Sequence, residues 1–202
     1  MSDPLRTVLF FDGQNLYHGA KDAWAPVPHS PGNVYAWPSY DVESISSWLV
    51  SRKAGRRLQQ VRFYTGVPDP HRGNVEEFWH GFWTNKLRHL GSRGVYVYRG
   101  RVNAGGQEKG VDVSLAIDLI RLTYESAYDV AIILSQDADF IPAVKLAKEI
   151  AHSQGRQIGI ECAYPQNPSH PRGIVGTEWV QITKTDYDTH RDPREYRIRQ
   201  YP

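Results

Sequence analysis

The apolar residues of this chain fall into two alternating patterns. Short, uninterrupted apolar runs are typical of strands that are buried on both faces of a parallel sheet. The longer segments between them carry apolar residues at every third or fourth position, which is the spacing of one face of an α-helix. We predict strands at 7–11, 61–64, 94–98, 130–134 and, with more polar interruption, 157–162.

The helical periodicity marks four segments, which are 41–51, 74–90, 110–124 and 138–152. Asp41 is a suitable N-cap for the first, because its carboxylate can accept a hydrogen bond from the backbone of the first turn. Segment 110–124 is apolar almost all round, which predicts a helix that is buried on more than one side. Strands alternating with helices predict an α/β fold with a mostly parallel central sheet flanked by helices.

Three segments stand outside this pattern. Residues 24–40 contain four prolines and predict an irregular excursion. Residues 99–109 combine glycines with charged side chains, which predicts a mobile loop. The end of the chain, 187–202, is rich in charged residues and predicts a tail. We therefore expect a single domain over 1–186, interrupted by the excursion and followed by the tail.

The composition narrows the function classes. Lys and Arg number 24 against 22 Asp and Glu among the 202 residues, so a polyanion would bind at a local patch rather than through net charge. A single cysteine, Cys162, excludes an intrachain disulfide and a cysteine-based zinc site. No apolar run approaches the roughly 18 residues of a membrane span. We expect a cytoplasmic protein with no membrane partner.

Carboxylates follow two of the predicted strands directly. Asp12 comes after strand 7–11, and Asp137 and Asp139 come after strand 130–134. Because ligands of open α/β sheets bind outside the carboxyl ends of the strands, these acids belong to one edge of the sheet. Asp112, at the start of helix 110–124, is delivered to the same edge by the strand before it. Four such acids cannot all stay ionised close together without a cation, and hard oxygen ligands suit Mg²⁺ or Mn²⁺.

Other interpretations of the charged residues stay open. An Asp after a strand is often only the N-cap of the next helix, and this holds for each acid taken alone. Asp118 lies about 240° further round the helix than Asp112, so we interpret it as a structural partner for an arginine. Arg99, Arg101 and Lys109 flank the acidic edge, either as phosphate contacts or as part of a solvated loop.

The aromatic residues also allow two interpretations. Trp79 and Trp83 lie beside the apolar stripe of helix 74–90, where they predict packing at the boundary of the core or a face for self-association into a homo-oligomer. Trp24, Tyr35 and Trp37 belong to the excursion, where packing on the domain is favoured over stacking with nucleic-acid bases. A glycine-rich dinucleotide or nucleotide-triphosphate loop is absent from the sequence.

Three sequence blocks carry a family resemblance. They are Val-Leu-Phe-Phe-Asp-Gly-Gln-Asn-Leu-Tyr at 8–17, Lys-Gly-Val-Asp-Val at 109–113 and Leu-Ser-Gln-Asp-Ala-Asp-Phe at 134–140. In this order and spacing they resemble the signature blocks of NYN domains, a branch of the PIN-like nuclease superfamily close to the LabA-like group. The resemblance covers about residues 6–185. It implies a single Rossmann-like PIN domain with a ribonuclease site that depends on Mg²⁺ or Mn²⁺.

The resemblance also implies site residues. The family's acids, and the asparagine near the first of them, fall residue by residue on Asp12, Asn15, Asp112, Asp137 and Asp139. The family most often has glycine where this chain has Gln136. The leading hypothesis is a metal-dependent ribonuclease that hydrolyses phosphodiester bonds of single-stranded or structured RNA. The alternative is a nucleic-acid-binding or scaffold protein that keeps the PIN-like fold and does not cut.

Overall fold

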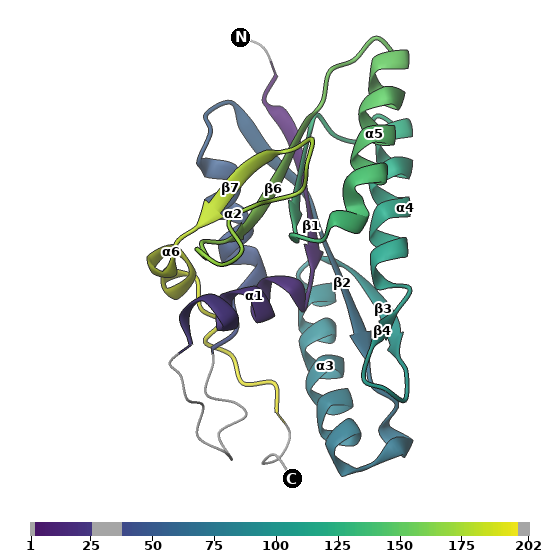
Figure 1. Cartoon of the computed structure of the whole chain (residues 1–202), viewed down its shortest axis with the longest axis vertical. Helices are drawn as coiled ribbons and strands as arrows, with labels where there is room; N and C mark the ends of the chain where they lie inside the picture. Colours follow the sequence, from purple (N-terminus) through teal and green to yellow (C-terminus); the bar gives the residue numbers. More distant parts are fainter. Residues whose placement is uncertain (1–2, 26–37, 198–202) are drawn as a thin grey trace.

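The computed structural model describes residues 3–25 and 38–197, and these form an α/β domain around one seven-stranded sheet (Figure 1). The strand order is β4-β3-β2-β1-β5-β6-β7, and each neighbouring pair is parallel except β3 with β4. The strands are β1 (Leu5–Asp12), β2 (Arg56–Val67), β3 (Tyr96–Val102), β4 (Glu108–Lys109), β5 (Val130–Leu134), β6 (Gly159–Pro165) and β7 (Glu178–Ile182). This confirms the predicted α/β fold with a mostly parallel sheet.

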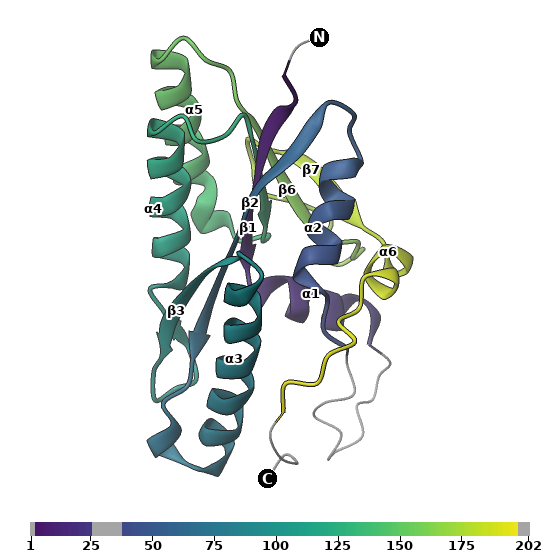
Figure 2. The same cartoon turned by 180° about the vertical axis from the view of Figure 1, so that it is seen from behind.

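Helices cover both faces of the sheet, as the two opposite views show (Figures 1 and 2). They are α1 (Asn15–Trp24), α2 (Val42–Ser51), α3 (Asn74–Ser92), α4 (Val111–Tyr124), α5 (Ile141–Ser153) and α6 (Lys184–Thr189). Leu9 and Phe11 of β1 pack in the core with α1, α2 and α3, whereas Phe10 packs with α4 and α5. Both faces of β1 are therefore buried over residues 8–11, which explains the uninterrupted apolar sequence of that stretch.

The predicted elements lie where their patterns placed them, with differences at the ends. Asp41 caps α2 as expected, because its Oδ1 accepts a hydrogen bond from the Ser44 N–H at 2.9 Å. The segment predicted as helix 138–152 begins with a short 3-10 turn at Ala138–Phe140 before α5. Among the elements outside the predicted ranges are α1, β7 and α6. Both β7 and α6 are short, with five and six residues, so their periodic patterns are weak.

The predicted loop at 99–109 is wrong, because this segment forms a β-hairpin. Arg101 lies opposite Lys109 in the antiparallel pairing of β3 with β4. Asn103 shapes the turn, since its side-chain oxygen accepts hydrogen bonds from the N–H groups of Gly105 and Gln107 at 3.0 and 2.9 Å. The glycines therefore serve a tight turn between paired strands, which charge and glycine content alone do not reveal.

The burial predicted for helix 110–124 is also wrong on one face. Val113, Ile117 and Tyr124 of α4 are 62%, 56% and 71% exposed. Leu115 and Leu119 on the opposite face are fully buried against the sheet. α5 packs beside α4 on the same sheet face, so the outward face of α4 stays in contact with solvent.

The two ends of the excursion and the tail lie against the domain. The Trp24 indole N–H donates to the Gln166 carbonyl at 3.2 Å, which is packing on the domain; Tyr35 and Trp37 lie outside the described residues. In the C-terminal segment, Arg194 pairs with Asp41 at 2.5 Å across the start of α2. Among the described helices, none has the length and apolar character to cross a membrane.

Candidate active site

Asp12 ends the central strand β1 and is the most buried of the predicted acids, at 6% exposure. Its neighbours on β1 alternate between the two faces of the sheet, which directs its carboxylate to the face covered by α4 and α5. Oδ1 accepts a hydrogen bond from the Asn15 N–H at 3.3 Å, and Oδ2 accepts one from the Ser135 hydroxyl at 3.1 Å. The carboxylate is therefore fixed between the ends of β1 and β5.

The turn after Asp12 depends on Gly13. A Cβ atom at this position would lie 2.5 Å from the Phe63 ring and 2.9 Å from the Tyr64 carbonyl oxygen. Any larger residue would push the turn away from β2, to which the Gly13 N–H is hydrogen-bonded at 2.8 Å. Asn15 then begins α1, and its Oδ1 accepts a hydrogen bond from the Gln136 N–H at 3.2 Å. Asn15 thus joins the two acid-bearing turns.

Asp137 and Asp139 occupy the turn after β5. The Asp137 N–H donates to the Ser135 hydroxyl at 3.1 Å, and its own Oδ1 accepts from the Asp139 N–H at 2.9 Å. Asp137 therefore has a capping role in the 3-10 turn. The turn accommodates Gln136 without a left-handed backbone, and the Gln136 amide donates to the carbonyl oxygens of His170 and Arg172, both at 2.9 Å. Glutamine in place of glycine thus links this turn to the loop after β6.

Asp112 lies in the first turn of α4, two residues after Gly110, whose φ of +80° reverses the chain from β4 into the helix. Repulsion between the negative charges affects the pKa values of Asp112 and of its acidic neighbours. Burial, together with the negative charges of Asp112 and Glu108, raises the pKa of Asp12 to about 7. Partial burial and the charges of Asp137 and Asp139 raise the pKa of Asp112. The structure therefore brings the four predicted acids into one interacting group.

Glu108 is an acid of this group that the sequence analysis did not identify. Its Oε1 accepts hydrogen bonds from the Gln14 amide at 3.0 Å, from the Thr65 hydroxyl at 3.2 Å and from the Gly66 N–H. Burial raises its pKa, and the charge of Asp112 adds to the effect. The available signal was its position four residues before Asp112, but the assignment of 99–109 to a loop concealed it.

The predicted phosphate contacts reach the same edge of the sheet on its other face. Arg99 and Arg101 line a hollow of about 480 Å³ together with His80 of α3. This face is the one covered by α3, whereas Asp12 faces α4 and α5. Lys109 lies opposite Arg101 on β4 and is exposed. The two arginines and Asp12 thus lie on opposite faces of the sheet, at the same edge.

The donor set fits a hard divalent cation, because the converging side chains offer carboxylate and amide oxygens. A buried carboxylate with a raised pKa next to further acids is the environment that a cation would relieve. Among residues 3–25 and 38–197, however, no three acidic, histidine or cysteine side chains stand close enough together to hold a metal ion. Binding would require side chains to rotate, and Asp112 and Asp139 are exposed and able to do so.

The chain belongs to the NYN domain family, whose sequence profile matches residues 6–153. It is similar to the 6-hydroxy-3-succinoylpyridine 3-monooxygenase HspA of Pseudomonas putida, with 24% identity over 195 residues and 79% of this chain covered. The chain spans only 60% of the length of that relative.

A protein of unknown function from Vibrio parahaemolyticus has a similar solved structure, with a TM-score of 0.53 and 16% identity. The match covers 93% of this chain and 98% of that protein, and at this identity it shows the fold alone. The family match confirms the resemblance drawn from the three sequence blocks, and the fold is consistent with a place among PIN-like domains.

Proposed function

We propose that this protein is a divalent-metal-dependent ribonuclease that acts in the cytoplasm. The observation that carries the proposal is the buried carboxylate of Asp12, with a pKa of about 7, at the carboxyl edge of the sheet among other acids. Such a group is costly to ionise unless a cation accompanies it. Membership of the NYN family supports a nuclease-like activity.

In this proposal Asp12, Asp112, Asp137 and Asp139 hold Mg²⁺ or Mn²⁺. A bound divalent ion would supply an activated water and would neutralise charge on the phosphate. Asn15 is anchored by the bond from the Gln136 N–H to its Oδ1, which leaves its amide nitrogen to orient a water or a phosphate oxygen.

The substrate strand would cross the edge of the sheet. Its reacting phosphate lies on the acidic face, and its neighbouring phosphates contact Arg99, Arg101 and Lys109 on the other face. Contacts of this kind position a strand without reading its sequence. They are consistent with single-stranded RNA, whose backbone can turn over an edge.

The test is incubation of purified protein with mixed single-stranded RNA and DNA, with Mn²⁺ or with EDTA. We expect RNA cleavage with Mn²⁺ that EDTA and Asp112→Asn abolish. The matched control is Glu149→Gln, which changes an exposed acid of α5 that, among the described residues, forms an ion pair only with Lys145, at 3.9 Å. Cleavage that persists in Asp112→Asn would refute the site.

The alternative is a protein that binds nucleic acid without cutting it. The observation that favours it is that the described acids do not form a closed set of metal ligands. It predicts RNA binding by the wild type and no cleavage with any divalent cation.

A further inference from the structure

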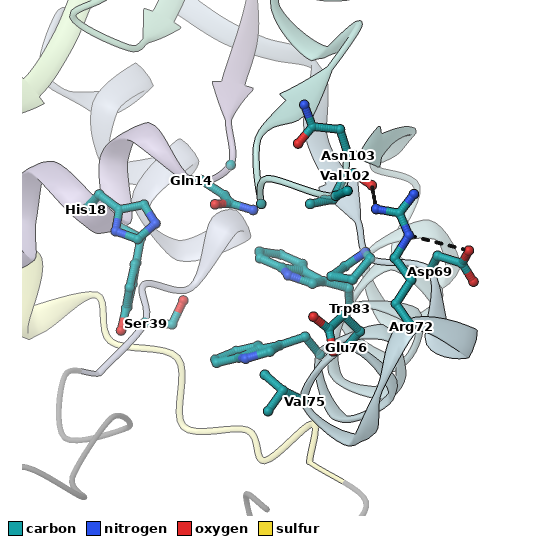
Figure 3. A pocket seen from close by; sticks show the side chains of 16 residues that line it. Gln14, His18, Ser39, Asp69, Arg72, Val75, Glu76, Trp83, Val102 and Asn103 are labelled. Carbon is teal, nitrogen blue, oxygen red and sulfur yellow. Dashed lines mark hydrogen bonds and ion pairs between the residues drawn. The ribbon is translucent and has the colours of Figure 1, made fainter.

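A pocket of about 340 Å³ opens beside the turn that follows Asp12, between α1, α3 and the β3–β4 hairpin (Figure 3). Trp79 and Trp83 of α3 and Tyr17 of α1 supply aromatic walls. The volume lies at the low end of the roughly 300–1,000 Å³ of small-ligand pockets. It suits a planar ring system of one or two rings rather than a large ligand.

Phe82 packs against both indoles. Trp79 and Trp83 are four residues apart, so they share one face of α3. Phe82 contacts both in nearly perpendicular geometry, with ring centroids 5.6 Å from Trp79 and 5.3 Å from Trp83. Both indoles are half-buried and line the pocket. Preorganised aromatic rings of this kind offer a surface on which another planar ring can stack.

The pocket reaches the turn that follows Asp12, although none of the acids of the acidic group lines it. Gly13 and Gln14 line it, and they directly follow Asp12. The Cα atoms of Asp12 and Gln14 are at most about 7 Å apart, because each residue spans no more than about 3.6 Å. The Gln14 amide also donates to Glu108, as described above. A ligand that reaches the acids with one part can therefore reach the aromatic walls with the next.

The charges at the rim favour a neutral ring over a phosphate. Arg72 lies 3.8 Å from Asp69 and donates to the Val102 carbonyl at 3.3 Å, so its charge is partly compensated. Glu76 adds a second carboxylate beside Trp83 (Figure 3). Carboxylates repel phosphate oxygens but accept hydrogen bonds from ring N–H and amino groups. The pocket thus combines aromatic faces with acceptors for N–H donors.

Basic side chains lie on either side of this pocket. The hollow that contains Arg99 and Arg101 shares Arg72 with it. A second aromatic hollow of about 220 Å³ shares Trp79 and Trp83 and continues toward Arg194. Alternating aromatic and basic contacts are the pattern by which proteins hold the bases and phosphates of a single strand.

We infer that this pocket binds a base of the nucleic-acid strand, one nucleotide from the phosphate presented to the acids. The inference rests on the proposed nuclease function and extends it with a base-stacking site on Trp79 and Trp83. It assigns the two indoles a role beyond the boundary packing or self-association that their sequence positions predict.

The test measures binding in EDTA, so that cleavage plays no part. The probes are a labelled ten-residue oligoadenylate and a sugar-phosphate chain of the same length that lacks all bases. We expect Trp79→Leu and Trp83→Leu each to weaken binding of the oligoadenylate by about 5- to 150-fold, the range for one lost stacking contact. Binding of the abasic chain should be unchanged, because its phosphates do not use the indoles.

Two control variants separate stacking from structural damage. Trp83→Phe keeps a flat ring and should retain most of the affinity lost in Trp83→Leu. Trp179→Leu removes an indole on β7 that is 45% exposed and outside the pocket, and it should bind like the wild type. Equal losses for both probes, or unchanged binding of the oligoadenylate by both tryptophan-to-leucine variants, would overturn the inference. Stacking in EDTA without cleavage in Mn²⁺ would instead refute only the nuclease proposal.

Discussion

The raised pKa of Asp12 makes a quantitative prediction about stability. The folded-state pKa of about 7 lies above the ordinary value of 3.8, because burial and neighbouring acids disfavour the charged form. Between these two pH values the folded chain holds a proton that the unfolded chain has released. Stability from this group is therefore present at low pH and is lost as pH rises through 7. At about 1.4 kcal/mol for each pKa unit, the full difference is about 4 kcal/mol.

Asp12→Asn removes this dependence while keeping the local contacts. The amide oxygen can accept from the Asn15 N–H, and the amide nitrogen can donate to the Ser135 hydroxyl. In EDTA the free energy of unfolding of the variant should exceed that of the wild type at pH 8. The difference between the two proteins should grow by about 3 kcal/mol from pH 5 to pH 8.

The measurement is urea unfolding of both proteins at several pH values between 5 and 8, in EDTA throughout. Taking the difference between variant and wild type cancels the groups that titrate equally in both. Mn²⁺ should then stabilise the wild type at pH 8 and leave the variant unchanged, because the cation favours the ionised carboxylate. A difference that stays constant with pH would refute the reasoning, since Asp12 would then ionise in the fold without cost.

Three further outcomes follow from the contacts described above. Asp118→Ala should lower the free energy of unfolding by about 3–5 kcal/mol, because it strips the buried Arg62 of its 2.6 Å partner; urea unfolding measures the loss. Asp137→Asn should keep the metal-free melting temperature, since asparagine is also a good cap, but should lose the upward shift that Mn²⁺ gives the wild type. Arg99→Ala with Arg101→Ala should reduce the salt dependence of RNA binding by about 0.7 in log–log slope for each lost phosphate contact; an unchanged slope would return both arginines to a solvent-exposed role.

The strands and the acids at their ends could be predicted from the sequence, because the determining interactions are local or follow from topology. Residues 8–11 and 130–134 are apolar at every position, because both faces of these strands are covered. Parallel strands bring their carboxyl ends to one edge, so Asp12 and Asp137 had to share it. The structural role of Asp118 as a partner for an arginine was likewise predicted from its helix angle, and its ion pair with Arg62 confirms it.

Other features depend on how distant segments pack, and tertiary structure alone decided them. The side of the sheet on which Arg99 lies follows from the pairing of β3 with β2 and β4, which a glycine-rich segment does not encode locally. The aromatic pocket exists because α3 packs near the turn after β1, more than 60 residues earlier in the chain. The pKa of Asp12 is raised by desolvation and by the charges of Asp112 and Glu108, and neither the burial nor the proximity of these charges exists until the chain has folded. The sequence alone thus determines which residues stand at the carboxyl edge of the sheet. Packing determines how deeply they are buried, on which face of the sheet they lie and which charges surround them.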